Sequence, residues 1–93
     1  MPDKSVYNYP NPVEGSFTVI RYWLDEDAEV SIEIIDLRKG NLVDKFGGPG
    51  IGLTNNEVVW NVENVQSGIY FCRVHAKNQT HEKMVTITIA VTK

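Results

Sequence analysis

The chain has 93 residues, 42% hydrophobic and 23% charged, and its 9 Lys and Arg against 12 Asp and Glu give a net charge of -3. A chain of this size buries roughly 60–65% of its unfolded surface, which suffices for one modest core but not for a deep pocket as well. An independent enzyme is therefore disfavoured. A nucleic-acid partner is disfavoured too, because no basic face is available to neutralise a phosphate backbone.

The single Cys cannot close an intrachain disulfide, and no run approaches the ~18 apolar residues that a membrane helix needs. Direct membrane insertion is not expected. The first twelve residues lack the apolar segment of a signal peptide, so we expect any export signal to lie on a longer parent protein.

The N-terminal part of the chain predicts two extended segments. Residues 6–9 form a short strand, and Tyr9-Pro10-Asn11-Pro12 follows as a sheet edge, because proline lacks a ladder donor and favours extended geometry before it. Strict alternation then predicts a long strand over residues 18–24. The residues expected to face inward are Thr18, Ile20, Tyr22 and Leu24; those expected on the outer face are Phe17, Val19 and Trp23.

The middle of the chain alternates again after the polar break at residues 25–27. Val30, Ile32 and Ile34 predict a second half-buried strand, which we expect to form a hairpin with residues 18–24. Residues 36–40 supply turn chemistry, with an Asp at the start and a Gly at the end, and residues 42–46 return as a short strand. The glycine-rich residues 47–52 predict a mobile loop between sheets.

Three further strands complete the prediction. Residues 56–60 form one, residues 61–67 a polar crossover, and residues 69–74 another, with Tyr70, Cys72 and Val74 inside. After a turn at residues 78–80, residues 85–91 alternate most clearly of all. About seven strands at this spacing predict an all-β, seven-stranded antiparallel immunoglobulin-like sandwich, with residues 1–93 as a single domain. The expected core is Ile20, Tyr22, Leu24, Val30, Ile32, Ile34, Trp60, Tyr70, Val74, Val85, Ile87 and Ile89.

Several motifs occur in a characteristic order. They are Tyr9-Pro10-Asn11-Pro12, Ile20-x-Tyr22-x-Leu24, Val30-x-Ile32-x-Ile34-Ile35-Asp36-x-x-x-Gly40-x-x-Val43, Trp60-Asn61, Ser67-Gly68-Ile69-Tyr70-Phe71 and Lys83-Met84-Val85. In this order the chain resembles the C-terminal sorting domain of proteins exported by the bacterial type IX secretion system. It is similar, more loosely, to the immunoglobulin-like domain of the flagellar hook-capping protein. The short distance between Trp60 and Gly68 favours the sorting domain.

The resemblance implies a non-catalytic export tag at the C-terminus of a larger protein. Its partners would be the outer-membrane secretion machinery and the upstream domains of that parent. Its location would be the periplasm in transit, then the cell surface or the medium. We expect the terminal strand to be the recognition element, because an exposed edge can accept strand addition, and the same strand offers a route to self-association. The residues concerned are Val85, Thr86, Ile87, Thr88, Ile89 and Lys93.

The outer aromatic stripe of Phe17, Val19 and Trp23 supports an alternative function. Such a stripe contacts a protein or stacks on sugar rings, as in an adhesion or accessory binding module, and the sequence favours protein contact. Position within the parent separates the two functions, since a sorting domain must come last in its chain.

No cofactor, metal site or catalytic residue is expected. Cys72 and His75 fall on opposite faces of a strand, and with His81 they lack a fourth zinc ligand. The acidic residues 25–27 lack the spacing of a calcium loop, and the glycines of residues 48–52 are not followed by a helix that would bind phosphate.

Overall fold

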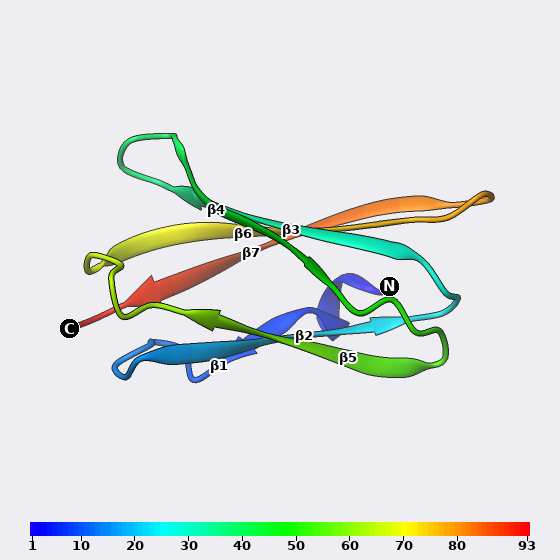
Figure 1. Ribbon diagram of the computed structural model, residues 1–93, viewed down its shortest axis with the longest axis horizontal. Coiled ribbons are helices and arrows are strands. Elements are labelled where there is room, and N and C mark those ends of the chain that lie inside the picture. Colours follow the sequence, from blue (N-terminus) through cyan, green and yellow to red (C-terminus); the bar gives the residue numbers. More distant parts are fainter.

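The computed structural model describes residues 1–93 and consists of two antiparallel sheets packed face to face (Figure 1). A 3-10 turn, η1 (Asp3–Ser5), precedes seven strands: β1 (Tyr7–Tyr9), β2 (Phe17–Leu24), β3 (Glu29–Asp36), β4 (Leu42–Gly48), β5 (Thr54–Asn61), β6 (Gly68–Lys77) and β7 (Glu82–Val91). One sheet has the order β1-β2-β5 and the other the order β4-β3-β6-β7. This confirms the predicted seven-stranded immunoglobulin-like sandwich. None of its helical segments has the length and apolar character needed to cross a membrane.

The core lies between the two sheets and is built by alternation along β2, β3 and β6, whose inward side chains are nearly all buried. Trp60 and Tyr70 pack edge to face at its centre, with ring centroids 5.7 Å apart and planes at 75°. Of the twelve predicted core residues, eleven are buried and Ile87 is partly buried. Val13 and Val62 are fully buried and were not predicted.

The expected hairpin between residues 18–24 and residues 30–34 is wrong. β2 pairs with β1 and β5, whereas β3 pairs with β4 and β6, so the chain crosses from one sheet to the other between Leu24 and Glu29. Both arrangements give the same inward and outward alternation in each strand. The long partners β5 and β6, both distant in sequence, determine the sheet in which each strand lies.

The glycine-rich segment is not a mobile loop throughout. Gly47 and Gly48 belong to β4, paired with β3, and the remainder is tied to the neighbouring connection between β2 and β3. Ala28 N–H donates to Gly50 O at 3.1 Å, and Gly52 N–H donates to Asp27 Oδ1 at 2.7 Å. A Cβ on Gly50 would overlap the Ala28 carbonyl oxygen. Glycine is required here by close backbone approach.

The predicted turn at residues 36–40 lies beside the start of β6, where Leu37 N–H donates to Ile69 O at 3.1 Å. Asp36 Oδ1 accepts from Arg38 N–H at 2.8 Å, and Gly40 follows with a φ of 70°, which glycine adopts without strain. At the same end, the Tyr70 hydroxyl donates to Gln66 O at 2.6 Å and fixes the crossover before β6.

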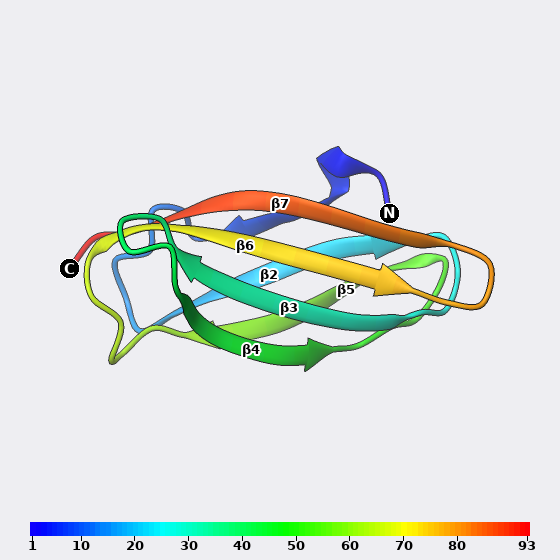
Figure 2. The same cartoon turned by 90° about the horizontal axis from the view of Figure 1, so that it is seen from above.

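The sandwich has four strand edges, arranged in two pairs. Seen from above, β4 and β5 lie on one side of the molecule, whereas β7 and the N-terminal segment lie on the other (Figure 2). The peptide bonds before Pro10 and Pro12 are both cis, and this proline segment connects β1 to the region beside the end of β7.

Candidate recognition surfaces

The terminal strand β7 divides its side chains between the core and the solvent. Val85 and Ile89 are buried and Ile87 is partly buried, whereas Thr86 and Thr88 are exposed on the outer face of the four-stranded sheet. Thr86 lies opposite Arg73 of β6, and Arg73 in turn forms an ion pair with Glu33 of β3 at 3.8 Å. The apolar half of the strand therefore holds it rigidly, and the threonines remain available for contact.

Part of the main-chain edge of β7 is covered by the proline segment. The Asn11 side chain donates to Thr88 O at 3.2 Å and accepts from Ala90 N–H at 3.1 Å, as a neighbouring strand would. Val13 then donates to Ala90 O and accepts from Thr92 N–H. These contacts show that the peptide groups of Thr88, Ala90 and Thr92 point away from β6. We refer to residues 11–13 as the clasp.

The alternation of an antiparallel ladder extends this geometry toward the start of the strand. The peptide groups of Met84 and Thr86 point away from β6 in the same direction, beyond the reach of the clasp. At the other end, Lys83 Nζ pairs with Asp3 at 3.0 Å. An open window of main-chain edge, from Met84 to the N–H of Thr88, therefore lies between the clasp and this ion pair.

Lys93 lies beyond β7 and fastens the crossover between β5 and β6. Its ammonium donates to Val62 O and to Glu63 O, the latter at 2.9 Å, and its backbone N–H donates to Ser67 Oγ at 2.9 Å. Lys93 is thus held against the body of the domain.

The outer face of the three-stranded sheet carries the predicted aromatic stripe and two tyrosines besides. Phe17 is 50% exposed, and Val19 and Trp23 are partly buried. Tyr7 and Tyr9 of β1 lie alongside, with ring centroids 6.0 Å apart. Sequence reasoning missed these tyrosines as part of the face, although their spacing of two residues signals a common side of a strand.

A polar network holds this face in place. Glu57 accepts from the Tyr9 hydroxyl at 2.5 Å and from Arg21 at 3.0 Å. These hydrogen bonds lower the pKa of Glu57 below its ordinary value, and the carboxylate in turn raises the pKa of Tyr9. At the end of the stripe, Trp23 Nε1–H donates to Asp25 Oδ1 at 3.3 Å.

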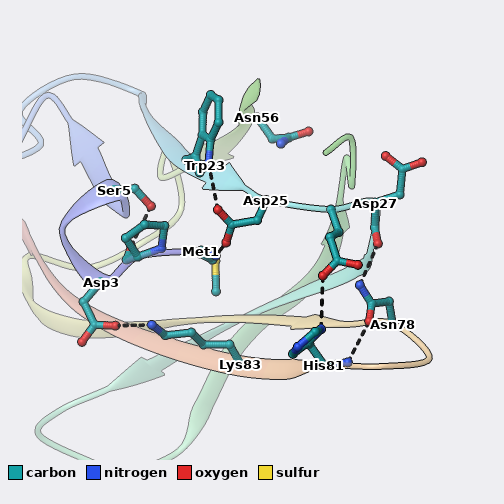
Figure 3. Close-up of polar contacts among 12 residues, drawn as sticks. Met1, Asp3, Ser5, Trp23, Asp25, Asp27, Asn56, Asn78, His81 and Lys83 are labelled. Atoms are coloured by element: carbon teal, nitrogen blue, oxygen red, sulfur yellow. Dashed lines mark hydrogen bonds and ion pairs between the residues drawn. The ribbon is translucent and has the colours of Figure 1, made fainter. Parts of the chain in front are cut away.

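Several polar contacts lie at the end of the sandwich where β2 is connected to β3 (Figure 3). The terminal ammonium of Met1 bonds Asp25 at 2.6 Å and lowers the pKa of this carboxyl, while the Asn78 side chain donates to Asp27 O at 3.1 Å. The Glu26 carboxylate lies 3.1 Å from His81 Nδ1. The Asp27 carboxylate accepts from Gly52 N–H at 2.7 Å, so each of the three carboxylates of this connection has a separate partner.

The three residues considered as zinc ligands lie apart. Cys72 is fully buried, and burial raises the pKa of its thiol to about 12, which makes it an inert core residue. His75 pairs with Glu82 at 2.6 Å on the outer face, and His81 lies at the tip of the β6–β7 hairpin. No group of three or more His, Cys, Asp or Glu side chains is placed to bind a metal ion.

Together these features define a class of protein: a rigid immunoglobulin-like module that offers strand edges and an aromatic face for contact. The sequence matches the family described as secretion system C-terminal sorting domain over residues 7–88, and the chain belongs to this family. Neither the curated proteins nor the solved structures contain a match. The domain is thus a C-terminal sorting signal for type IX secretion.

Membership of this family fixes the setting in which the domain acts. The domain is part of a larger parent protein, interacts with the secretion machinery, and directs export through the periplasm to the cell surface or the extracellular space. The family is in general non-catalytic.

Proposed function

We propose that the secretion machinery recognises this sorting domain at β7, through the open window of main-chain edge and the threonines beside it. The recognition element is the one predicted from the sequence: Val85, Thr86, Ile87, Thr88, Ile89 and Lys93. The observation that supports it most strongly is the clasp, which covers the second half of the edge and leaves Met84 and Thr86 uncovered. A strand of the receptor that added here would extend the four-stranded sheet.

The side chains of this element have separate roles. Val85 and Ile89 anchor the strand in the core, so its edge is presented in one conformation. Thr86 and Thr88 project beside the edge and are placed to contact the receptor directly. Lys93 holds the end of the chain against Val62 and Glu63 and thereby positions the strand without contacting the receptor.

We further propose that residues 1–93 fold as one domain, located at the C-terminal end of the parent, without catalytic activity of its own. One core cluster of 18 buried residues draws on every strand except β4 and the three-residue β1, which supports a single folding unit. The only thiol is buried and each histidine lies beside a glutamate, which argues against a catalytic Cys–His pair.

The aromatic face of Phe17, Val19 and Trp23 is proposed as the contact for an upstream domain of the parent. Exposed apolar surface on a small domain marks protein contacts. Joining the domain to its parent should therefore protect Trp23 from fluorescence quenching, and a Trp23-dependent affinity for soluble sugars would contradict this assignment.

Export of a reporter tests recognition at β7. A fluorescent passenger carries an export signal and this domain, in a bacterium with an intact type IX system. Thr86→Pro removes a backbone N–H that points away from β6, so it deletes an external donor without breaking the internal ladder. We expect this variant to leave the passenger in the periplasm.

The matched control is Val59→Pro, which removes an outward N–H from the edge of β5 in the other sheet. Circular dichroism of both purified domains checks that each one folds. We expect a passenger that carries the Val59→Pro domain to be exported as well as one that carries the unaltered domain. Export of folded Thr86→Pro at the unaltered level, or loss of export in both folded variants, would contradict recognition at β7.

A further inference from the structure

Three of the four strand edges of the sandwich carry a feature that restricts pairing with another strand along at least part of their length. β1 has only three residues and is followed by Pro10 and Pro12, which cannot donate to a ladder. β7 is covered in part by the clasp. β4 is interrupted by a bulge opposite Ile34 and Ile35, and the Asp44 carboxylate accepts from the outward N–H of Lys45 at 2.9 Å. Natural sheets use such devices to prevent unwanted pairing.

The edge of β5 has none of these devices. Its eight residues contain no proline and no glycine, and they pair with β2 without a bulge. Val62 N–H donates to Ser16 O at 2.8 Å, so by alternation the peptide groups of Asn55, Glu57, Val59 and Asn61 point away from β2. The only contact on these groups is a long one of 3.5 Å, from Thr54 Oγ1 to Asn55 O.

The charge on this edge is also compensated. Glu57 is the only charged residue of β5, and its carboxylate is bonded by Arg21 and Tyr9 of the same sheet. Next to it, the Val59 side chain is 59% exposed on the outer face. An exposed, regular edge with an apolar centre, whose one charge is already paired within its own sheet, suits pairing with another strand.

We propose that this edge pairs with the β5 edge of a second copy of the chain, in antiparallel orientation about a two-fold axis at Val58. The two three-stranded sheets then form one continuous six-stranded sheet. This register pairs Asn55 with Asn61 of the other copy and Glu57 with Val59 of the other copy. Every outward peptide group of the strand is used, and no like charges face each other.

Other registers of the same edge fit less well. An axis at Glu57 places the two Glu57 carboxylates directly opposite each other, which is destabilising. An axis at Val59 leaves Asn55 outside the paired strand, opposite Glu63. The self-complementary register at Val58 is the reason for assigning a second copy, rather than an unrelated strand, to this edge.

Sedimentation velocity of the 93-residue chain, from micromolar to millimolar concentration, tests this inference without any secretion machinery. We expect a reversible monomer–dimer equilibrium that is strengthened by salt, because two chains of charge -3 repel each other. Val59→Glu places a second carboxylate opposite Glu57 of the partner copy at two symmetric positions. Val59→Lys places an opposite charge there.

The two variants therefore separate the proposed register from its alternatives. The dissociation constant of Val59→Glu should exceed that of Val59→Lys by about tenfold, since two cross-strand charge pairs change sign. Thr86→Glu, on the β7 edge, is the matched control and should leave the dimer unchanged. A chain that stays monomeric to millimolar concentration, equal weakening by both Val59 variants, or a dimer sensitive only to Thr86→Glu would each overturn the proposal.

Discussion

Replacement of Asn11 by Ala would remove the side chain that covers Thr88 O and Ala90 N–H on the β7 edge. Two hydrogen bonds are lost, one to Thr88 O at 3.2 Å and one from Ala90 N–H at 3.1 Å. Each exposed bond of this kind contributes about 0.5–1 kcal/mol, so we expect the free energy of unfolding to fall by about 1–2 kcal/mol. For a domain of this size the melting temperature falls by about 5–15 °C.

Amide hydrogen exchange by NMR gives the sharper readout, because it observes the covered edge directly. The Ala90 amide should exchange faster in Asn11→Ala by a larger factor than the amide of Val74, which lies in the interior of the same sheet and changes only with the global stability. Asn11→Asp is the matched control: its carboxylate still accepts from Ala90 N–H but no longer donates to Thr88 O. Unchanged Ala90 exchange and unchanged melting in Asn11→Ala would refute the idea that the clasp limits the open window.

Three further predictions concern the core and the connections. Trp60→Ala should lower the free energy of unfolding by about 3–5 kcal/mol in urea denaturation, because a fully buried indole is lost; an unaltered midpoint would contradict the packing against Tyr70. Gly50→Ala should lower it by at least about 2 kcal/mol, because the new Cβ meets the Ala28 carbonyl, whereas Gly15→Ala, with open space around it, should change little. Burial raises the pKa of both Cys72 and Tyr22 to about 12, from ordinary values of 9.0 and 10.0, so the unfolded chain loses these protons first. The free energy of unfolding should therefore be highest below about pH 9 and should fall as the pH rises toward 12. Cys72→Ala should remove the part of this fall that begins near pH 9. A free energy of unfolding that stays constant in urea titrations from pH 8 to 11 would contradict the burial of these two groups.

Alternation along single strands predicted most of the fold. Ile20, Tyr22, Ile32 and Val74 all lie where a period of two places them, because each strand buries one face against the other sheet. The pairing of β2 with β3 was predicted wrongly, since a short polar connection is compatible both with a hairpin and with a crossing between sheets. Strand partners distant in sequence decide that choice, and local pattern contains no information about them.

Isolated buried residues escaped prediction for a related reason. Val62 is the only fully buried residue of a polar crossover, and Val13 lies between Pro12 and Glu14, so neither belongs to a periodic segment. The clasp could not be predicted either: the sequence indicated that Asn11 belongs to a sheet edge, but only the tertiary structure places its side-chain amide against β7. The order of the motifs predicted the family nonetheless, because those motifs fix the turns.

Secretion of a passenger tests the central claim most directly. This domain is placed behind an export signal and a fluorescent passenger, in one bacterium with an intact type IX system and in one that lacks it, and the cells are fractionated. A sorting domain delivers the passenger to the surface or the medium only when the system is intact. Passenger retained in the periplasm of both strains, or released equally by both, would contradict the assigned function.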